Sequence, residues 1–496
     1  MEHILVIDTG SSSMRGILIN EEGKIIVRHH IKHSMKTLEG GIAVQAAEDF
    51  RNGLIAICKS IGMKGHRISA LAFTSQRSSV LPVDEAGKPL SDILMWHDKR
   101  SSKLCDEINQ TSAKALYQIC GMKASPVFSA PKMLWLKQNQ PELYQKAHKL
   151  LGIHDYLLFL STGKFITDTS LASRTCLLDI HKRQWSPELL KLFEIDEEKL
   201  CTLIPVGQVV GKLTADFAAL TGLREGIPVI SAGGDQQCSA LGQGLGYIAE
   251  AGITSGTASY VVSIVDKPIL DEKLRVNVNI AAEEDKYILE ASNMASGAVY
   301  RWLKEIMYSQ EVDFKQMNEE IQSSNPGARG VIMLPDLAGC GCPHWDPMAR
   351  GMFFNLGFET ERSDMLRAVL EGIGAEITEC IDTLVTLTPD IKFLRSTGGL
   401  AKFRLFSQII ADMTNRPVEI CSQKETTALG AWVVAATTLG IFKSKKEALA
   451  KLTQEETCNK VLQPNVRDHE LYAKQKEARK YIRSCINSAE LARILH

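Results

Sequence analysis

The chain has 496 residues, enough for two or more domains of ordinary size and for a cleft between them. Its 57 Lys and Arg residues nearly balance its 58 Asp and Glu residues, which gives a formal net charge of -1. This balance provides no overall field to attract nucleic acid or an anionic membrane, so we expect neither as a partner and expect any anion to be bound locally.

The chain opens with MEHILVIDTG, which lacks the basic start and apolar core of a secretion signal, so we expect a cytoplasmic protein. Residues 4–19, ILVIDTGSSSMRGILI, set two apolar runs around a Gly/Ser turn and predict a β-hairpin. Asp8 ends the first run. A carboxylate beside such a turn suits either a proteolytic dyad or the handling of Mg-bound phosphate, and the hairpin alone does not decide between them.

The next elements indicate an α/β layer structure. Strands are predicted at Ile25–His30 and Ile68–Thr74, and Ala46–Ile61 spaces its apolar residues at helical intervals. The glycine-dense stretch Gly233–Gly246 suggests a crossover between two halves, so we place a domain boundary near residue 244.

The opening pattern recurs after this boundary. Residues 253–264, ITSGTASYVVSI, again place a Ser/Gly/Thr turn before an apolar run. We therefore expect two similar lobes that face each other, an N-terminal lobe of residues 1–243 and a C-terminal lobe of residues 244–496.

The C-terminal half is predicted to be rich in helices. The apolar stretch Ala431–Phe442 is too short to span a bilayer and is read as a buried helix. The last thirty or so residues alternate charge around an amphipathic stripe, which is typical of a solvated packing helix. Further helices are expected at Ala298–Tyr308, Asp364–Leu384 and Lys402–Met413.

The 12 cysteines are too sparse for a disulfide scaffold, so we expect reduced and mostly buried thiols. Cys340, Cys342 and His344 form the one cluster that hints at a metal. No second Cys/His pair lies at zinc-finger spacing, so the cluster is interpreted as a turn with incidental thiols.

The rest of the chain decides between protease and phosphate chemistry. An aspartic protease needs a second Asp-(Thr/Ser)-Gly, and the nearest match, Asp168-Thr169-Ser170, lacks the glycine. Two small-residue turns, in contrast, provide backbone N–H donors that approach a triphosphate from both sides. Asp8 then lies where a hydrated Mg²⁺ would bridge the phosphates. Two ordinary Gly/Ser hairpins remain the alternative.

The order of motifs along the chain resembles the FGGY carbohydrate kinases, the group that includes glycerol kinase and xylulokinase. The resemblance rests on ten segments in sequence: DTGSSSMR at 8, TSQR at 74, MWHDKR at 95, FSAPKMLWLKQNQPE at 128, GGDQQ at 233, ITSGTAS at 253, SGAVYRWL at 296, DMLRAVLEG at 364, STGGLAK at 396 and ETTALGAW at 425.

The resemblance implies an α/β fold of two actin-like (ribonuclease H-like) ATPase lobes with an interlobe cleft. It also implies ATP-dependent phosphorylation of a hydroxyl of a small sugar, ketose, sugar acid or polyol, with ATP and Mg²⁺ as cofactors. We further expect a homodimer or another homo-oligomer.

In the family the carboxylate of the GDQ motif is the general base, and Asp235 matches it. Phosphoryl transfer from ATP requires an alcohol to be placed in line with the γ-phosphorus and its proton to be received, and an Asp can do both. The alternative is that Asp235 only caps the following helix, Gln236–Leu241. The match assigns Asp235 and Gln236 to the substrate, and Asp8 together with Asp235 to the metal.

The nucleotide-binding positions also carry over by match. The first phosphate loop corresponds to Thr9, Gly10, Ser11, Ser12, Ser13 and Arg15, and the second, on the γ-phosphate side, to Ser255, Gly256 and Thr257. Each small residue taken alone could be a turn requirement. The adenosine segment corresponds to Gly297, Gly398, Gly399 and Lys402, although a lysine at a helix start is often only solvated.

The polyol pocket corresponds to Gln76, Arg77, Trp96 and Asp98. An aromatic face packs on C–H groups, while amide, guanidinium and carboxylate groups bind hydroxyls; each of the four could instead be structural.

The chain also departs from the family pattern. Glycerol kinases carry Glu-Thr where this chain has Ser78 and Ser79, and a Tyr where it has Val127; xylulokinases carry Gln-Met-His-Gly, so Arg77 departs from them. Asn355 also breaks a signature pattern, whereas the remaining signature residues Lys132, Trp135, Asp364 and Glu371 are kept. We interpret the chemistry as retained and the substrate as changed, to a ketose, a sugar acid or a polyol other than glycerol.

Two rivals stay open on the sequence. An actin-like protein that uses ATP to switch or assemble needs the two loops but no sugar pocket, and Arg77, Trp96 and the Gly-Gly-Asp-Gln stretch argue against it. A degenerate kinase that only senses a sugar is suggested by Ser78 and Val127.

Overall fold

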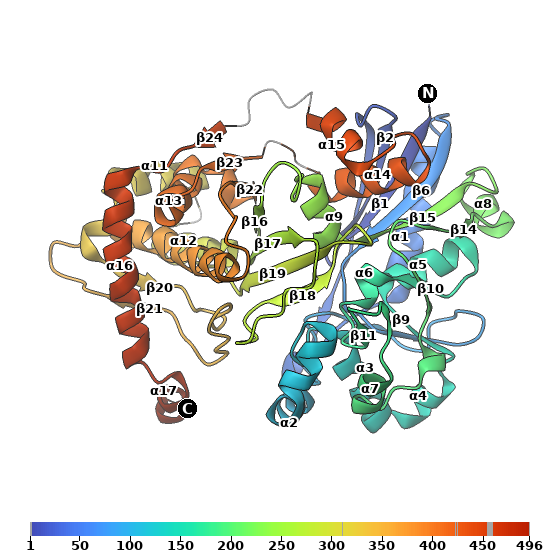
Figure 1. Cartoon of the computed structure of the whole chain (residues 1–496), viewed down its shortest axis with the longest axis horizontal. Helices are drawn as coiled ribbons and strands as arrows, with labels where there is room; N and C mark the ends of the chain where they lie inside the picture. The colour runs from blue at the N-terminus through green and yellow to red at the C-terminus, as the bar shows by residue number, and fades with distance from the viewer. Residues whose placement is uncertain (1, 310, 422, 424, 454–459, 496) are drawn as a thin grey trace.

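The structure is a computed structural model that describes residues 2–309, 311–421, 423, 425–453 and 460–495. Two α/β lobes lie side by side, each built on one large mixed sheet, with the N-terminal chain in one lobe and most of the C-terminal chain in the other (Figure 1). The expected α/β class with two sheet-containing lobes is therefore confirmed.

The first sheet has six strands in the order β14-β15-β6-β1-β2-β3. The predicted opening hairpin forms its middle: β1 pairs antiparallel with β2 on one side and parallel with β6 on the other. The strands are β1 His3–Thr9, β2 Ser13–Asn20, β3 Ile25–Lys32, β6 Ile68–Ser75, β14 Val209–Lys212 and β15 Pro228–Gly234.

The second sheet repeats this plan with one more strand, in the order β18-β19-β17-β16-β22-β23-β24. Its hairpin β16/β17 takes the place of β1/β2, and β16 runs parallel to β22 as β1 does to β6. The recurrence expected at residues 253–264 is thus a recurrence of topology. The strands are β16 Ala251–Ser255, β17 Ser259–Val265, β18 Asn277–Ile280, β19 Tyr287–Asn293, β22 Leu394–Gly398, β23 Val418–Ile420 and β24 Lys460–Leu462.

Both faces of the first sheet are buried, because β1 is apolar at consecutive positions rather than at alternate ones. Leu5 and Ile7 pack toward α1 Ala47–Gly62, α5 Ile153–Thr162 and α8 Ala215–Thr221, whereas Ile4 and Val6 face the opposite side. That opposite side is covered by α9 Asp235–Gly242, α14 Thr426–Thr438 and α15 Lys445–Thr453.

Helices α9 and α14 cross where glycine is required on both. A Cβ on Gly242 would lie 1.9 Å from the Thr426 carbonyl oxygen, and one on Gly430 would lie 1.8 Å from the Cys238 carbonyl oxygen. The buried helix expected near Ala431 is therefore present, and it brings the C-terminal chain back onto the first sheet. The division of the chain near residue 244 stays a prediction.

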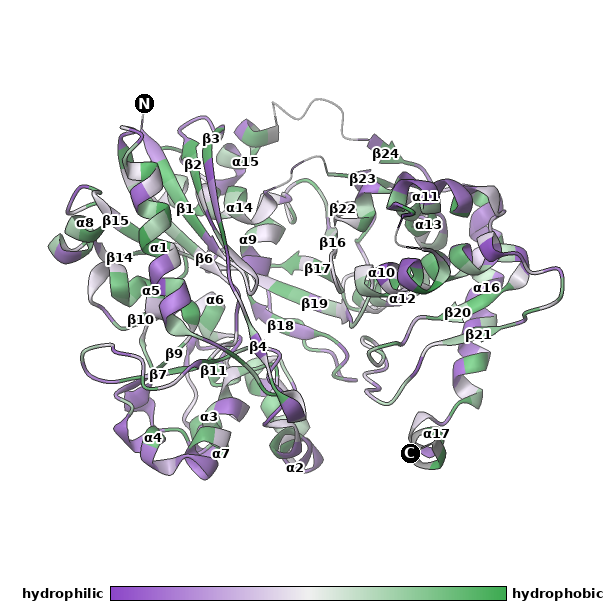
Figure 2. Cartoon of the chain, turned by 180° about the vertical axis from the view of Figure 1, so that it is seen from behind, coloured by the Kyte–Doolittle hydropathy of each residue, from purple (hydrophilic) through white to green (hydrophobic). Residues whose placement is uncertain are grey.

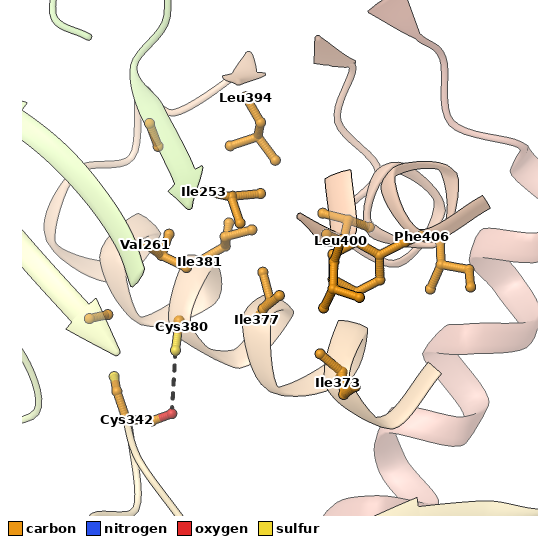
Figure 3. Packing of buried hydrophobic residues seen from close by; sticks show 14 of the residues in the cluster. Ile253, Val261, Cys342, Ile373, Ile377, Cys380, Ile381, Leu394, Leu400 and Phe406 are labelled. Carbon is orange, nitrogen blue, oxygen red and sulfur yellow. Dashed lines mark hydrogen bonds between the residues drawn. The ribbon is translucent and has the colours of Figure 1, made fainter. Parts of the chain in front are cut away.

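The second sheet packs one face on the long helix α12 Arg362–Leu387. Ile373, Ile377 and Ile381 recur every four residues on α12 and point toward Ile253, Val261, Leu394, Leu400 and Phe406 (Figure 3). Strands β17 and β19 are largely green, and so hydrophobic, in Figure 2. The other helices of this lobe are α10 Gly297–Met307, α11 Phe314–Ser323, α13 Arg404–Thr414, α16 Val466–Cys485 and α17 Ser488–Leu495, with the hairpin β20 Ile332–Leu334 and β21 Met352–Phe354.

Residues 76–206 add a smaller layer below the first sheet, with its own apolar cluster. This layer touches the second lobe: the Tyr117 hydroxyl donates to the Val276 carbonyl (2.8 Å), and the Val278 N–H donates to the Gly121 carbonyl (2.9 Å). Its helices are α2 Ser102–Cys120, α3 Ser129–Asn139, α4 Pro141–Lys146, α6 Thr169–Ala172 and α7 Pro187–Leu192, and its short strands are β7 Leu81–Val83, β8 Ile93–Leu94, β9 Lys149–Leu151, β10 Ile166–Asp168, β11 Leu178–Asp179, β12 Gln184–Trp185 and β13 Thr202–Ile204. Two short strands from earlier in the chain, β4 Lys36–Thr37 and β5 Ala43–Gln45, join β8 in a three-stranded sheet.

The C-terminal segment differs from its expectation. It forms two helices, α16 and α17, because the backbone of Ile486 is extended. Helix α16 does pack on the second lobe, but through polar groups, such as the Arg479 guanidinium on the Met333 carbonyl (2.6 Å) and the Tyr472 hydroxyl on Glu371 (2.8 Å). Signature residue Glu371 is thus a packing anchor in this structure.

Candidate active site

The first loop connects β1 to β2 as a tight turn in which the Gly10 N–H donates to the Ser13 carbonyl (2.9 Å). Asp8 lies at the end of β1 and is buried. Its Oδ2 is 2.6 Å from Nη2 of Arg15, whose Nη1 in turn contacts Glu425 Oε2 at 3.0 Å. Thr9 is buried and its carbonyl accepts the Gln76 N–H at 2.7 Å, so the loop is tied to the next strand.

Burial is the main reason that the pKa of Asp8 rises to about 6; Arg15 opposes this rise, and the negative charges of Asp235 and Glu425 reinforce it. Asp8 and Asp235 are therefore close enough to repel each other. A divalent cation would relieve both the burial and the repulsion, so this pair of carboxylates fits the donor set that Mg²⁺ takes in proteins.

The second loop packs against the two glycine segments that were assigned to adenosine. Ser255 ends β16 opposite Gly398 on β22, and a Cβ on Gly398 would lie 2.3 Å from the Ser255 carbonyl oxygen. The Gly297 N–H, at the start of α10, donates to the Gly256 carbonyl at 3.0 Å, and the Ser296 N–H donates to the Thr257 carbonyl. These close approaches require small residues, so Ser255, Gly256, Thr257, Gly297 and Gly398 form one cluster.

The end of this cluster is open. Gly256, Thr257, Gly398 and Gly399 are exposed, and a Cβ on Gly399 would meet no atom within 4 Å. Lys402 is exposed and ends a single 3-10 turn, while α13 begins at Arg404, two residues later than predicted. The expectation that Lys402 starts this helix is wrong.

Asp235 is the first residue of α9, directly after β15, and its side chain is 27% exposed. Its Oδ1 accepts the Gln236 N–H at 2.8 Å and lies 3.4 Å from Arg77 Nε. Burial raises the pKa of Asp235, and Arg77 and the Gln236 N–H partly offset this rise. The hydrogen bond from the Gln236 N–H is one that an Asp at the start of a helix makes, and the raised pKa is the property that a general base needs. Asp235 has both.

A buried ion cluster next to Asp235 was missed by the sequence analysis. Glu290 on β19 of the second lobe has its Oε2 3.0 Å from Arg77 Nη1 and its Oε1 3.1 Å from Arg174 Nη1. Tyr260 on β17 also influences this group electrostatically. The available signal was a lone glutamate inside the apolar strand YILEASN, but its partners lie 213 and 116 residues away along the chain.

Of the four residues assigned to the polyol pocket, Arg77 lies beside Asp235. Gln76 and Trp96 lie at the first loop, and Asp98 is buried. Trp96 Nε1 donates to Ser11 Oγ (2.8 Å), which donates to Gln76 Oε1 (2.9 Å), so the aromatic ring is linked to the first loop. Asp98 is fully buried and accepts from the Ala43 N–H and from Arg100, so it holds Arg100 in place. Gln236 is half-buried beside Asp235.

Lys132, one of the signature residues, binds backbone carbonyls of the loop that precedes α3. The Lys132 ammonium is buried and donates to the carbonyls of Pro126, Val127 and Phe128 at 2.7–2.8 Å, which holds the loop that carries the unusual Val127. Burial lowers the pKa of Lys132 to about 7.

Two other signature positions lie in the second lobe. At the start of α12, Asp364 accepts hydrogen bonds from the Ser324 hydroxyl and the Glu361 N–H. Asn355 adopts a left-handed backbone in an exposed turn.

A small cavity includes Gln76 alone of the residues predicted to line the polyol pocket. Gln76, Ser78 and Ser79 line one side and His154 and Asp155 another, whereas Arg77, Trp96, Asp98 and Asp235 do not line it.

The Cys340-to-His344 turn does not form the metal cluster it hinted at. Cys380 donates to the Cys342 carbonyl (Figure 3). His344 contacts Glu379 at 3.0 Å. Cys340 instead lies with Asp336 and Glu376, a set that has the spacing of metal ligands. Arg483 contacts both carboxylates, so a cation already neutralises that set. The described cysteines other than Cys485 are buried, as expected.

Comparison with known proteins decides the family. Residues 3–242 match the N-terminal domain, and residues 251–439 the C-terminal domain, of the FGGY family of carbohydrate kinases. The chain belongs to this family. The resemblance seen in the ten motifs is confirmed, and with it the prediction of a carbohydrate kinase, a phosphotransferase.

Relatives span almost the full length of the chain. It is 31% identical to a xylulose kinase of Lactococcus lactis (91% of this chain, 90% of the relative) and 30% identical to a glycerol kinase of Trichlorobacter lovleyi (92% and 94%). It is 28% identical to a gluconokinase of Bacillus subtilis (90% and 88%). These FGGY enzymes carry different substrate names at similar identity, so identity alone does not select a substrate.

Solved structures agree on the fold. A ligand-bound xylulose kinase from Lactobacillus acidophilus superposes with a TM-score of 0.92 at 25% identity, covering 98% of each chain. The glycerol kinase of Plasmodium falciparum with ADP superposes with a TM-score of 0.90 at 27% identity, covering 98% of this chain and 99% of the other. Within the described residues, no helix combines the length and the apolar character needed to cross a membrane.

Proposed function

We propose that this FGGY kinase transfers the γ-phosphoryl group of ATP to a hydroxyl of a small ketose, sugar acid or polyol, with Asp235 as the general base. The observation that carries the assignment is the position of Asp235: it starts α9, its side chain is partly exposed, and Arg77 from the neighbouring loop lies 3.4 Å away. The names of the relatives, which include xylulose kinase and gluconokinase, support the acceptor class.

In this proposal the acceptor lies against Trp96, Gln76 and Arg77, and Asp98 acts through Arg100, which it fixes. Asp235 takes the proton of the acceptor hydroxyl as the hydroxyl oxygen forms its bond to the γ-phosphorus. The bond from that phosphorus to the β-phosphate oxygen breaks, and its electron pair stays on ADP. Gln236, at the same helix start, is assigned to the acceptor as well.

The nucleotide is assigned to the two loops. Backbone N–H groups of Thr9 to Ser13 and of Ser255 to Thr257 would hold the phosphates, with Arg15 beside the first loop. Gly297, Gly398, Gly399 and Lys402 would line the adenosine, where exposed glycines leave open surface for a flat contact. Asp8 and Asp235 would hold Mg²⁺, which neutralises charge on the phosphates when bound.

The rival functions make different demands. An actin-like switching protein has no need of a partly exposed carboxylate that lies beside a buried arginine, so the geometry favours the kinase. A sugar-binding sensor would bind an acceptor and release no ADP. We also expect a homodimer or other homo-oligomer, which light scattering after size-exclusion chromatography measures.

The test is a coupled assay of ADP release over pentuloses, hexuloses, polyols and aldonic acids, run on the natural chain and on Asp235→Ala. We expect one acceptor class to give turnover, and the variant to lose several orders of magnitude in kcat because no other group takes the proton. Affinity for ATP in the absence of Mg²⁺, measured by calorimetry, should change little and serves as the control for folding, because the proposed metal role of Asp235 does not enter it. Near-normal phosphorylation by the variant would refute the base.

A further inference from the structure

We propose that Glu290 is a positioning residue of the phosphoryl-transfer site: from the second lobe it holds Arg77 and Arg174, and so keeps one oxygen of Asp235 free for the acceptor hydroxyl. The inference deepens the proposed function, because it takes Asp235 as the base. Glu290 touches none of the reacting atoms and acts through Arg77.

The geometry gives each oxygen of Glu290 its own arginine. Oε2 is 3.0 Å from Arg77 Nη1 and Oε1 is 3.1 Å from Arg174 Nη1, with both guanidinium groups and the carboxylate buried. The guanidinium of Arg174 also stacks on the Phe128 ring, 4.8 Å from its centre. Because Glu290 belongs to the second sheet and both arginines to the first lobe, the pair joins the lobes at the floor of the site.

Arg77 therefore stands between two carboxylates. A free guanidinium pairs with a carboxylate through two parallel hydrogen bonds. Here Nη1 is taken by Glu290 and by Gln237 Oε1 (3.3 Å), and the contact of Arg77 with Asp235 runs from Nε to Oδ1, at 3.4 Å. Across the part of the chain that the structure describes, the contacts of Asp235 are to Oδ1, from Arg77 Nε and the Gln236 N–H.

The balance of charges around Asp235 supports the same positioning role for Glu290. Two arginines face two carboxylates, Glu290 and Asp235, with the Tyr260 hydroxyl as the other titratable group. Without the negative charge of Glu290, Asp235 alone would neutralise both arginines. Both oxygens of Asp235 would then be occupied, and neither would be free for the acceptor hydroxyl.

The variants are Glu290→Gln, the charge-balanced double variant Glu290→Gln with Arg174→Leu, and Glu290→Asp. The matched control is Glu371→Gln, which alters a buried glutamate of the same lobe whose arginine, Arg367, lies 2.8 Å away and whose other contacts are Tyr472 and the Gly327 N–H. Acceptors are D-xylulose, glycerol and D-gluconate. The double variant removes one negative and one positive charge, so Arg77 and Asp235 remain as a neutral pair. It therefore tests the same role of Glu290 if the single variant does not fold.

For Glu290→Gln and for the double variant we expect kcat to fall at least tenfold. The loss should appear in kcat rather than in the affinity for ATP, because Glu290 acts through Arg77 on the group that faces the acceptor. Glu290→Asp should recover part of kcat, and the Glu371→Gln control should leave kcat nearly unchanged. A kcat in both Glu290→Gln variants that is no lower than that of the control would overturn the proposal, since loss of packing alone would affect either buried glutamate.

A crystal structure of Glu290→Gln tests the proposal without any acceptor. We expect Arg77 to turn and pair with both oxygens of Asp235; Arg77 in its present place would overturn the inference. Absence of turnover by the natural chain with all three acceptors would count against the proposed acceptor class, whereas this structure would still decide the role of Glu290.

Discussion

At the scale of the single residue, Asp8 is a carboxylate whose burial lowers the stability of the ligand-free protein. It is buried at the end of a central strand, and its pKa is raised to about 6 because burial outweighs the attraction of Arg15. In the unfolded chain an Asp has its ordinary, lower pKa, so the folded protein binds the proton more tightly. Above pH 6 the ionised Asp8 therefore destabilises the fold, and this cost disappears as the pH falls below the unfolded pKa.

We predict that Asp8→Asn stabilises the ligand-free protein at pH 7.5 by about 1–3 kcal/mol, with a smaller gain at pH 5, because the amide has no charge to bury. Urea unfolding at both pH values measures this. Kinase activity with Mg²⁺ and ATP should fall by at least tenfold, roughly what loss of one metal-binding carboxylate costs. A variant that is less stable at pH 7.5 would show that the Arg15 contact outweighs burial.

At the scale of elements, the α9–α14 crossing depends on two glycines. For Gly430→Ala the added methyl would lie 1.8 Å from the Cys238 carbonyl oxygen, which is backbone and cannot turn away. Overpacking of this kind costs about 1–3 kcal/mol or more, which exceeds the gain of roughly 1 kcal/mol from the better helix propensity of Ala. We therefore predict a lower unfolding temperature.

The matched control for this prediction is Gly53→Ala in α1, where the methyl would meet side-chain atoms only, the nearest being His33 Cε1 at 3.2 Å. Differential scanning calorimetry of both variants should show Gly430→Ala unfolding at the lower temperature. Equal unfolding temperatures would mean that the two helices can separate at little cost, contrary to a close crossing.

Local sequence patterns predicted most elements but not their long-range partners. The hairpins at 4–19 and 253–264 and the helices near 46–61 and 364–384 were found, because alternation and helical spacing lie within a short window. The proposed site residues come from motifs, as at Asp235 and the glycine loops, and their roles stay predictions. Glu290 and Arg174 were missed because their pairing depends on how β19 meets the first lobe, which no local pattern encodes.

At the scale of the whole molecule, contacts at the base and in the middle join the two lobes. The Tyr117 contact with Val276 and the Gly121 contact with β18 hold the smaller layer, and the α9–α14 crossing holds the middle, whereas Gly256 and Thr257 on the second loop and the neighbouring Gly398 and Gly399 are exposed. Joints at the base and middle leave rotation of one lobe against the other as the motion that brings the exposed loop glycines nearer to Asp8.

We predict that a non-hydrolysable ATP analogue with Mg²⁺, together with the acceptor that supports turnover, reduces the radius of gyration in small-angle X-ray scattering, because both ligands contact both lobes only when the lobes rotate together. Each ligand alone is the control and should give a smaller change, since it bridges fewer of the contacts. Identical scattering with and without both ligands would mean that the lobes are already in their reactive arrangement, with the Glu290 contacts formed before any ligand binds.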